Sequence, residues 1–267
     1  IIVIAFLVGV IFLLRVDKIR VNSVLVSETK VIDSAQVREH VQSHISGMYA
    51  WVIPKNSVFL LPLVSIHKDI EHNFPYAKTV VVRRVGLQTI AVDITERKGV
   101  YLWCVDQTNS DCSFTDYDGY IFSKAPYFSG DVYVRLYGER TTDINGTGNF
   151  QNAVSMKNIT TLFGLLSTRG FTPVSFQQGV GQSTVTVKKN DHHVGIVVVP
   201  EFDAYNVDQT MGTLLTNATF ANSIEKMATI DLRFGNKIFY TYTGVKAEKN
   251  ITVQLETTDT PTENETV

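Results

Sequence analysis

The chain has 267 residues, and 44% of them are hydrophobic, which is enough to bury a sizeable core in one or two domains. Its formal net charge is -2 and its pI is about 6.3, and its densest basic pairs, at 83–84 and 188–189, lie beside alternating strand patterns. This composition argues against nucleic acid as a main partner, because no basic patch stands out.

Residues 1–14, IIVIAFLVGVIFLL, form an unbroken apolar run that ends at Arg15. The run has no polar face, and LLRVDKIRV after it offers no small residues for signal cleavage. Although a bilayer core needs about 20 apolar residues, the run predicts a transmembrane helix truncated at its start. A buried core helix is the alternative. We therefore expect a single-pass membrane protein with one large folded region on one side.

Residues 18–97 predict a module in the order β-α-α-β-β. Apolar residues recur at helical spacing in two segments, and β-branched residues dominate the two strands that follow. The predicted elements are a strand at 18–26, a helix from Asp33 or Ser34 to Gly47, a helix with Leu63, Ile66, Ile70 and Phe74 on one face, and strands at 78–84 and 88–96.

Residues 98–244 predict a mixed, mostly antiparallel α+β domain. Two helices are expected, at 150–169 and at about 207–217. The remaining residues, 245–267, are polar and acidic, and we expect a disordered tail because they bury little apolar surface. The predicted strands are 101–105, 114–122, 132–136, 173–177, 183–189, 194–199, 228–234 and 237–243.

The chain has two cysteines, Cys104 and Cys112, at either end of a polar insert between two predicted strands. Facing thiols at a hairpin neck favour a disulfide, which requires an oxidising compartment. Unpaired buried thiols are the second alternative. A zinc site is the third, but it needs two further ligands and no His or Cys lies near in sequence.

The sequence predicts no catalytic, cofactor-binding or metal site. It contains no nucleophile elbow, phosphate loop or dinucleotide motif. His40 and His44 have the i, i+4 spacing of metal ligands but lack further partners, so a solvated helix face is expected. His192 and His193 are expected in an exposed hairpin turn. The segment FTDYDGYIF lacks the Glu of a calcium loop and predicts a turn instead.

Three segments of the chain carry a resemblance to a known protein family. The first, NFPYAKTVVVRRVGLQTIAVDITERKGVYLW, contains Phe74-Pro75, the strand at 80–84 ending in basic residues, and Thr95-Glu96-Arg97. The second has Asp116, Gly119 and Phe122 in an Asp-x-x-Gly-x-x-Phe pattern, and the third, Ile230 to Arg233, reads Ile-Asp-Leu-Arg. In this order the segments resemble the FtsQ/DivIB family of cell-division proteins: the first resembles the POTRA domain of that family and the third its closing strand.

The resemblance covers about 15–244 and indicates a divergent member, since a usual proline after the basic strand and a glycine after the first strand are absent. It implies a POTRA-like domain at 18–97, a β domain at 98–244, and a large extracytoplasmic part held at the cytoplasmic membrane. It also implies a non-enzymatic divisome scaffold for septum formation. The implied partners are FtsB-like and FtsL-like bitopic proteins, without a cofactor or a small-molecule substrate.

The expected partner site is the last strand of the β domain. Residues 237–243 precede the polar tail, so the strand is predicted at a sheet edge, where an incoming strand can pair. Ile238, Tyr240 and Tyr242 would then point to one face and Phe239 to the other. Core packing is the alternative for Phe239 and Tyr240, and solvation is the alternative for Arg233. The predicted partner-binding residues are Arg233 and Phe234, from the resemblance, with Ile238, Phe239, Tyr240 and Tyr242 from the strand pattern.

Other classes of protein remain open from the sequence. One is a membrane-tethered enzyme of the cell envelope, which would need carboxylates or histidines brought together in space. Another is a eukaryotic type II membrane glycoprotein. A POTRA-bearing transport protein is a third, although only one POTRA-like copy is present. The glycoprotein alternative rests on five Asn-x-Thr triplets, at Asn145, Asn158, Asn217, Asn250 and Asn264.

Overall fold

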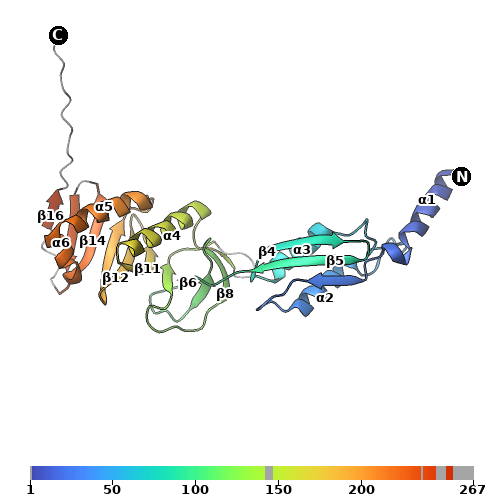
Figure 1. Cartoon of the computed structure of the whole chain (residues 1–267), viewed down its shortest axis with the longest axis horizontal. Coiled ribbons are helices and arrows are strands. Elements are labelled where there is room, and N and C mark those ends of the chain that lie inside the picture. The colour runs from blue at the N-terminus through green and yellow to red at the C-terminus, as the bar shows by residue number, and fades with distance from the viewer. Residues whose placement is uncertain (1, 142–146, 236, 245–250, 255–267) are drawn as a thin grey trace, which may run out of the picture. The chain divides into compact units, whose positions relative to one another are not determined.

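The computed structural model describes residues 2–141, 147–235, 237–244 and 251–254. The chain divides into two compact units, Ile1–Lys98 and Gly99–Val267 (Figure 1). The sequence placed this boundary between residues 97 and 98. Both units combine helices with sheets, so the predicted α+β class is confirmed.

The apolar N-terminal segment forms a short helix, α1, at Ile2–Leu14. Its 13 residues span about 20 Å at 1.5 Å per residue, whereas a bilayer core is about 30 Å thick. Within the described ranges, no helix combines the length and the apolar character needed to cross a membrane. The transmembrane helix predicted at 1–14 is therefore wrong, and so is the single-pass membrane location built on it.

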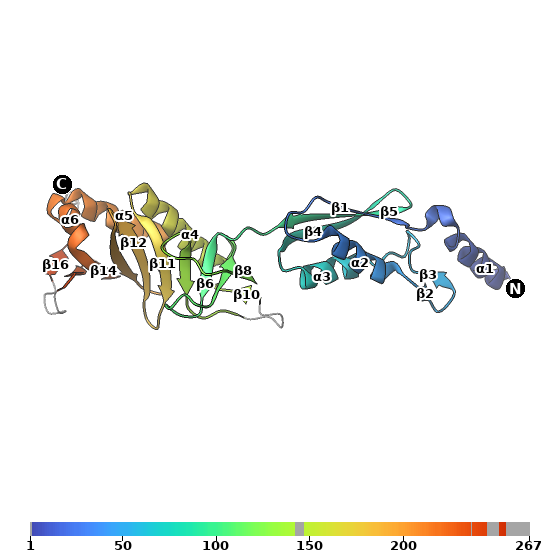
Figure 2. The ribbon, with the colours of Figure 1, turned by 90° about the horizontal axis from the view of Figure 1, so that it is seen from below.

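The rest of the first unit has a three-stranded sheet in the order β1-β5-β4. Helices α2 and α3 pack on one side of this sheet (Figure 2). Buried side chains of these helices and strands form the core of the unit. A small hairpin between the helices, β2 and β3, was not predicted from the sequence. The elements are β1 Ser23–Val26, α2 Ser34–Ile45, β2 Met48–Tyr49, β3 Ile53–Pro54, α3 Leu63–Asn73, β4 Ala77–Val85 and β5 Thr89–Glu96, preceded by a 3₁₀ turn at Asp17–Ile19.

A carboxylate at the end of β5 organises the loop before α2. The Glu96 side chain accepts hydrogen bonds from the backbone N–H groups of Lys30 at 3.0 Å, Val31 at 2.8 Å and Ile32 at 2.8 Å. Burial by itself raises the pKa of the Glu96 carboxyl, but these N–H donors outweigh it and hold that pKa below its ordinary value. Glu96 therefore joins the last strand of the unit to a loop more than sixty residues earlier.

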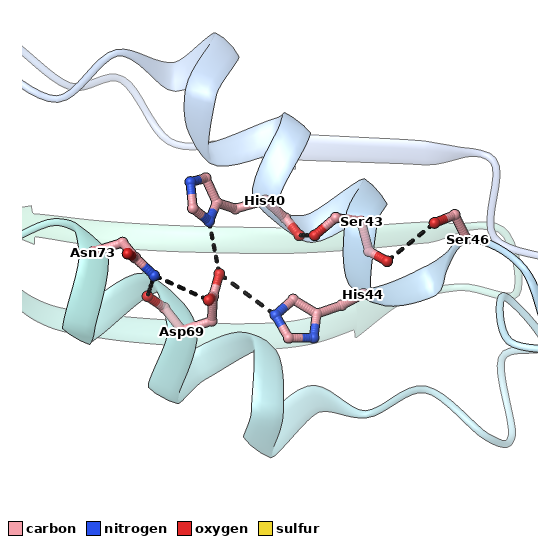
Figure 3. A network of polar contacts seen from close by, with 6 residues as sticks. All are labelled: His40, Ser43, His44, Ser46, Asp69 and Asn73. Atoms are coloured by element: carbon pink, nitrogen blue, oxygen red, sulfur yellow. Dashed lines mark hydrogen bonds and ion pairs between the residues drawn. The ribbon is translucent and has the colours of Figure 1, made fainter.

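A second polar contact joins α2 to α3 (Figure 3). One carboxylate oxygen of Asp69 lies 2.8 Å from His40 Nδ1 and 3.4 Å from His44 Nε2, and Asn73 donates to the other oxygen at 3.0 Å. The His40 ring also meets Phe74 edge-on at 5.1 Å. The sequence predicted a solvated helix face for His40 and His44, and the structure makes both side chains half-buried, because their rings turn toward α3.

Replacing Asp69 by Ala is expected to lower the free energy of unfolding of the first unit by about 1–2 kcal/mol, because hydrogen bonds to a charged group are lost. Glu71→Ala is the matched control. Glu71 pairs with His67, one turn away on the same helix, and such an exposed pair contributes less than about 0.5 kcal/mol. Urea unfolding of the two variants tests this, and equal losses would contradict a structural role for Asp69.

The second unit has one large sheet in the order β10-β8-β7-β6-β9-β11-β12-β13-β14-β15-β16. Its pairings are antiparallel except β6–β9, β9–β11 and β13–β14, which are parallel. The strands are β6 Tyr101–Cys104, β7 Cys112–Thr115, β8 Tyr120–Lys124, β9 Val134–Tyr137, β10 Gly148–Asn149, β11 Thr172–Gln178, β12 Ser183–Lys189, β13 His192–Val198, β14 Met227–Phe234, β15 Lys237–Tyr242 and β16 Ile251–Gln254.

Helices α4 Ala153–Thr168, α5 Ala204–Thr216 and α6 Ala218–Ser223 cover one face of this sheet (Figures 1 and 2). A 3₁₀ turn at Ile224–Lys226 leads into β14. The main core lies between these helices and the strands. Side-chain caps begin all three helices: Asn152 accepts from Ser155 N, Asp203 accepts from Asn206 N, and Asn217 accepts from Thr219 N and Phe220 N. The opposite face of β11 to β15 carries no helix in the described residues.

Candidate partner-binding site

The sheet of the second unit ends at β14, β15 and β16. Strand β14 turns into β15 around Gly235, whose φ of 64° lies in the left-handed region that glycine adopts without strain. Strand β16 then pairs antiparallel with β15, from Lys237 opposite Gln254 to Tyr240 opposite Ile251. The sequence predicted β15 as the edge strand, and this was wrong, because β16 lies outside it. Strand β16 also falls within the tail expected to be disordered, and the other residues of that tail lie outside the described part.

Three of the predicted contact residues face the core instead of the surface. Ile238 is fully buried, at 0% exposure, and Tyr240 and Tyr242 pack against the same core. The centroid of the Tyr240 ring lies 5.8 Å from that of Phe220 in α6 and 5.6 Å from that of Tyr242. Burial raises the pKa of the Tyr240 hydroxyl, and Tyr242 adds to this shift. These side chains hold β15 on the core, so they offer a partner little surface.

The other three predicted residues gather at the turn between β14 and β15. Phe234 is 51% exposed, and its ring packs edge-on against that of Phe239, with the two ring centroids 5.1 Å apart. The Arg233 guanidinium lies 5.2 Å from the Phe234 ring, and it donates to both carboxylate oxygens of Asp231, at 2.9 and 2.6 Å. We call these four residues, Asp231, Arg233, Phe234 and Phe239, the Phe234 cluster.

The Phe234 cluster is held in place rather than freely solvated. The bidentate pair with Asp231 fixes the guanidinium and raises its pKa. Sequence reasoning missed Asp231, although its place two residues before Arg233 on a strand puts both side chains on one face. Beside the cluster on the same face, Thr229 and Thr241 share a hydrogen bond of 2.7 Å between their hydroxyl oxygens. The exposed Phe234 ring therefore lies beside a sheet face that carries the hydroxyl groups of Thr229 and Thr241.

The two cysteines are joined by a disulfide. Cys104 ends β6, Cys112 begins β7, and the two are directly opposed with their Cα atoms 4.1 Å apart. This is the first of the three alternatives that the sequence left open. Both residues are buried, in a small apolar cluster with Leu102.

Among the described residues, no group of three or more His, Cys, Asp or Glu side chains is placed to hold a metal ion. His192 begins β13 and its Nε2 lies 2.7 Å from the Met227 carbonyl oxygen, and His193 Nε2 lies 3.1 Å from Asp131. The predicted turn at FTDYDGYIF is present, because Asp116 accepts from the N–H groups of Asp118 and Tyr120 at 3.0 Å.

The asparagine side chains of two Asn-x-Thr triplets make hydrogen bonds within the protein. Asn158 donates to the Phe202 carbonyl and accepts from Ala204 N, beside a cavity of about 660 Å³ at the starts of α4 and α5. Asn217 caps α6 by accepting from Thr219 N and Phe220 N. Asn145, Asn250 and Asn264 lie outside the described residues.

Of the six predicted partner-binding residues, the structure thus brings Arg233, Phe234 and Phe239 together in the Phe234 cluster, and it places Ile238, Tyr240 and Tyr242 against the core. In comparisons with known proteins, the sequence matches no protein-family model and no curated protein.

Proposed function

We propose that this chain is a non-enzymatic scaffold of cell division that holds partner proteins at the β14–β16 end of its large sheet. The proposed partners are small coiled-coil division proteins of the FtsB and FtsL kind. The order of three sequence segments that resemble FtsQ/DivIB supports this assignment. The observation that carries it is an exposed Phe234 beside the face of β14 and β15 that carries no helix in the described residues.

Strand addition suits this place physically. The end of a sheet presents unpaired N–H and C=O groups, so an incoming strand gains backbone hydrogen bonds. Aromatic and arginine side chains are the usual anchors of protein interfaces, and Phe234 and Arg233 supply one of each. The ion pair between Arg233 and Asp231 already holds the guanidinium in one geometry. The Arg233 side chain therefore loses little conformational entropy when a partner binds.

We expect Phe234→Lys to weaken binding of a purified FtsB-like protein of the source organism by about tenfold or more, because a central aromatic anchor is lost. Val180→Lys is the matched control. Val180 is fully exposed on the β11–β12 turn of the same unit, so it tests a new charge without touching the site. Titration by isothermal calorimetry gives both dissociation constants.

Circular dichroism must show that both variants keep the parent fold. Equal affinities for the parent chain and Phe234→Lys would place the contact elsewhere. If neither the FtsB-like nor the FtsL-like protein binds the parent chain, the division assignment itself fails.

A further inference from the structure

The outer edge of β15 is occupied by a segment of the chain itself. Strand β16 pairs with Lys237, Ile238, Phe239 and Tyr240, and runs antiparallel to them. The other edge of β15 is taken by β14, which in turn pairs with β13. A strand that is to join β15 must therefore take the place that β16 holds now.

Strand β16 is short for this position. It has four residues, whereas β15 has six, so Thr241 and Tyr242 extend beyond the pairing with β16. Four residues lie below the commonest strand length of about 5–6 residues, and a strand at a sheet end is held from one side only. The few backbone bonds that it gains are opposed by the conformational entropy of ordering it. A longer strand can pair with all six residues of β15.

Resting on the function proposed above, we propose that β16 is an exchangeable strand that masks the acceptor edge of β15. A partner strand replaces it, runs antiparallel to β15 and pairs with residues 237–242. The exchange is a regulatory device, because the chain and the partner compete for one set of backbone groups. It also specifies the partner chemistry as an extended segment with β-branched residues, as in the Ile-Thr-Val-Gln sequence of β16.

Addition to the free side of β16 is the weaker alternative. That side offers backbone groups from only four residues, and anything bound there is held no better than β16 itself. Replacement instead exposes the longer strand, which is fixed to the core by Ile238, Tyr240 and Tyr242.

A reversible lock tests the exchange in the full chain. Lys237 and Gln254 are directly opposed, so Lys237→Cys with Gln254→Cys is designed to tie β16 to β15 when oxidised and release it when reduced. The first probe is a fluorescent peptide with the sequence of residues 249–256, KNITVQLE. The same peptide with Pro in place of Val253 is its control, because proline cannot donate to a strand ladder.

In fluorescence anisotropy, we expect the oxidised lock to bind KNITVQLE at least about tenfold more weakly than the reduced form, because the competent state is no longer populated. The parent chain, treated with the same reductant, controls for opening of the Cys104–Cys112 disulfide. The single variant Lys237→Cys controls for loss of the lysine. Equal binding by the locked and reduced forms, or no binding by either, would overturn the exchange.

The second probe is the FtsB-like protein, measured on the same two forms. Binding that is lost on oxidation and restored on reduction supports both proposals. If the FtsB-like protein binds both forms equally, the exchange is overturned while the scaffold function stands. If the peptide exchanges and no division protein binds, the exchange stands and the assigned function fails.

Discussion

Changing Glu96 to Gln is expected to lower the free energy of unfolding of the first unit by about 2 kcal/mol at pH 7, because charge-assisted bonds to three backbone N–H groups are lost. Gln keeps the size of the side chain but removes its charge and one acceptor oxygen. The loop at 30–32 would then lose the group that orders its N–H donors. Urea unfolding followed by circular dichroism measures the loss, and hydrogen exchange in α2 and β5 assigns it to this unit.

The same variant has a defined pH dependence. The pKa of Glu96 is lower in the folded chain than its ordinary value of 4.5, so the carboxylate stabilises the fold above that pH. This stabilisation disappears as the pH falls through the lower, folded-state pKa. The difference between the parent chain and Glu96→Gln should therefore shrink steadily below pH 4.5. The exposed Glu39→Gln on α2 is the control, with an expected change within about 0.5 kcal/mol. A pH-independent difference would contradict the role of the charge.

Removing the disulfide by Cys104→Ala with Cys112→Ala is expected to destabilise the second unit by about 2–3 kcal/mol, because the unfolded chain regains the freedom of a closed loop with separation 8. Alanine is chosen because serine would place hydroxyl groups in the apolar cluster around Leu102. The melting temperature of the second unit should fall by about 5–10 °C.

Reductant provides the internal control for that measurement. It should lower the melting temperature of the parent chain toward that of the double variant and leave the double variant unchanged. Mass spectrometry after alkylation of the native chain should find no free thiol, and two alkylated cysteines would contradict the disulfide.

Several parts of the fold were predictable because their signals are local. Asp33 caps α2 by accepting from Ala35 N, two residues on, as its position before the apolar pattern predicted. The alternation along β15 predicted that Ile238, Tyr240 and Tyr242 share one face, and all three pack on the core. Side-chain direction along a strand repeats every two residues, so no distant partner is needed to predict it.

The candidate site was predicted only in part, because a local strand pattern does not specify which distant elements pack against the strand. Arg233 and Phe234 lie at the exposed turn, but Ile238, Tyr240 and Tyr242 are core residues whose ring and chain contacts come from α6 and the sheet. An alternating strand shows that two faces exist. It does not show which face the helices cover.

By itself, the sequence determined the mixed α+β class, the β-α-α-β-β order of the first unit and the hairpin that carries both cysteines, because helix periods, strand periods and turn residues act over a few positions. The tertiary structure alone decided the contact of Glu96 with residues 30–32, the turn of His40 and His44 toward Asp69, and the pairing of β16 with β15. Those contacts join residues far apart in the chain, and neither period nor composition specifies which distant group will meet them.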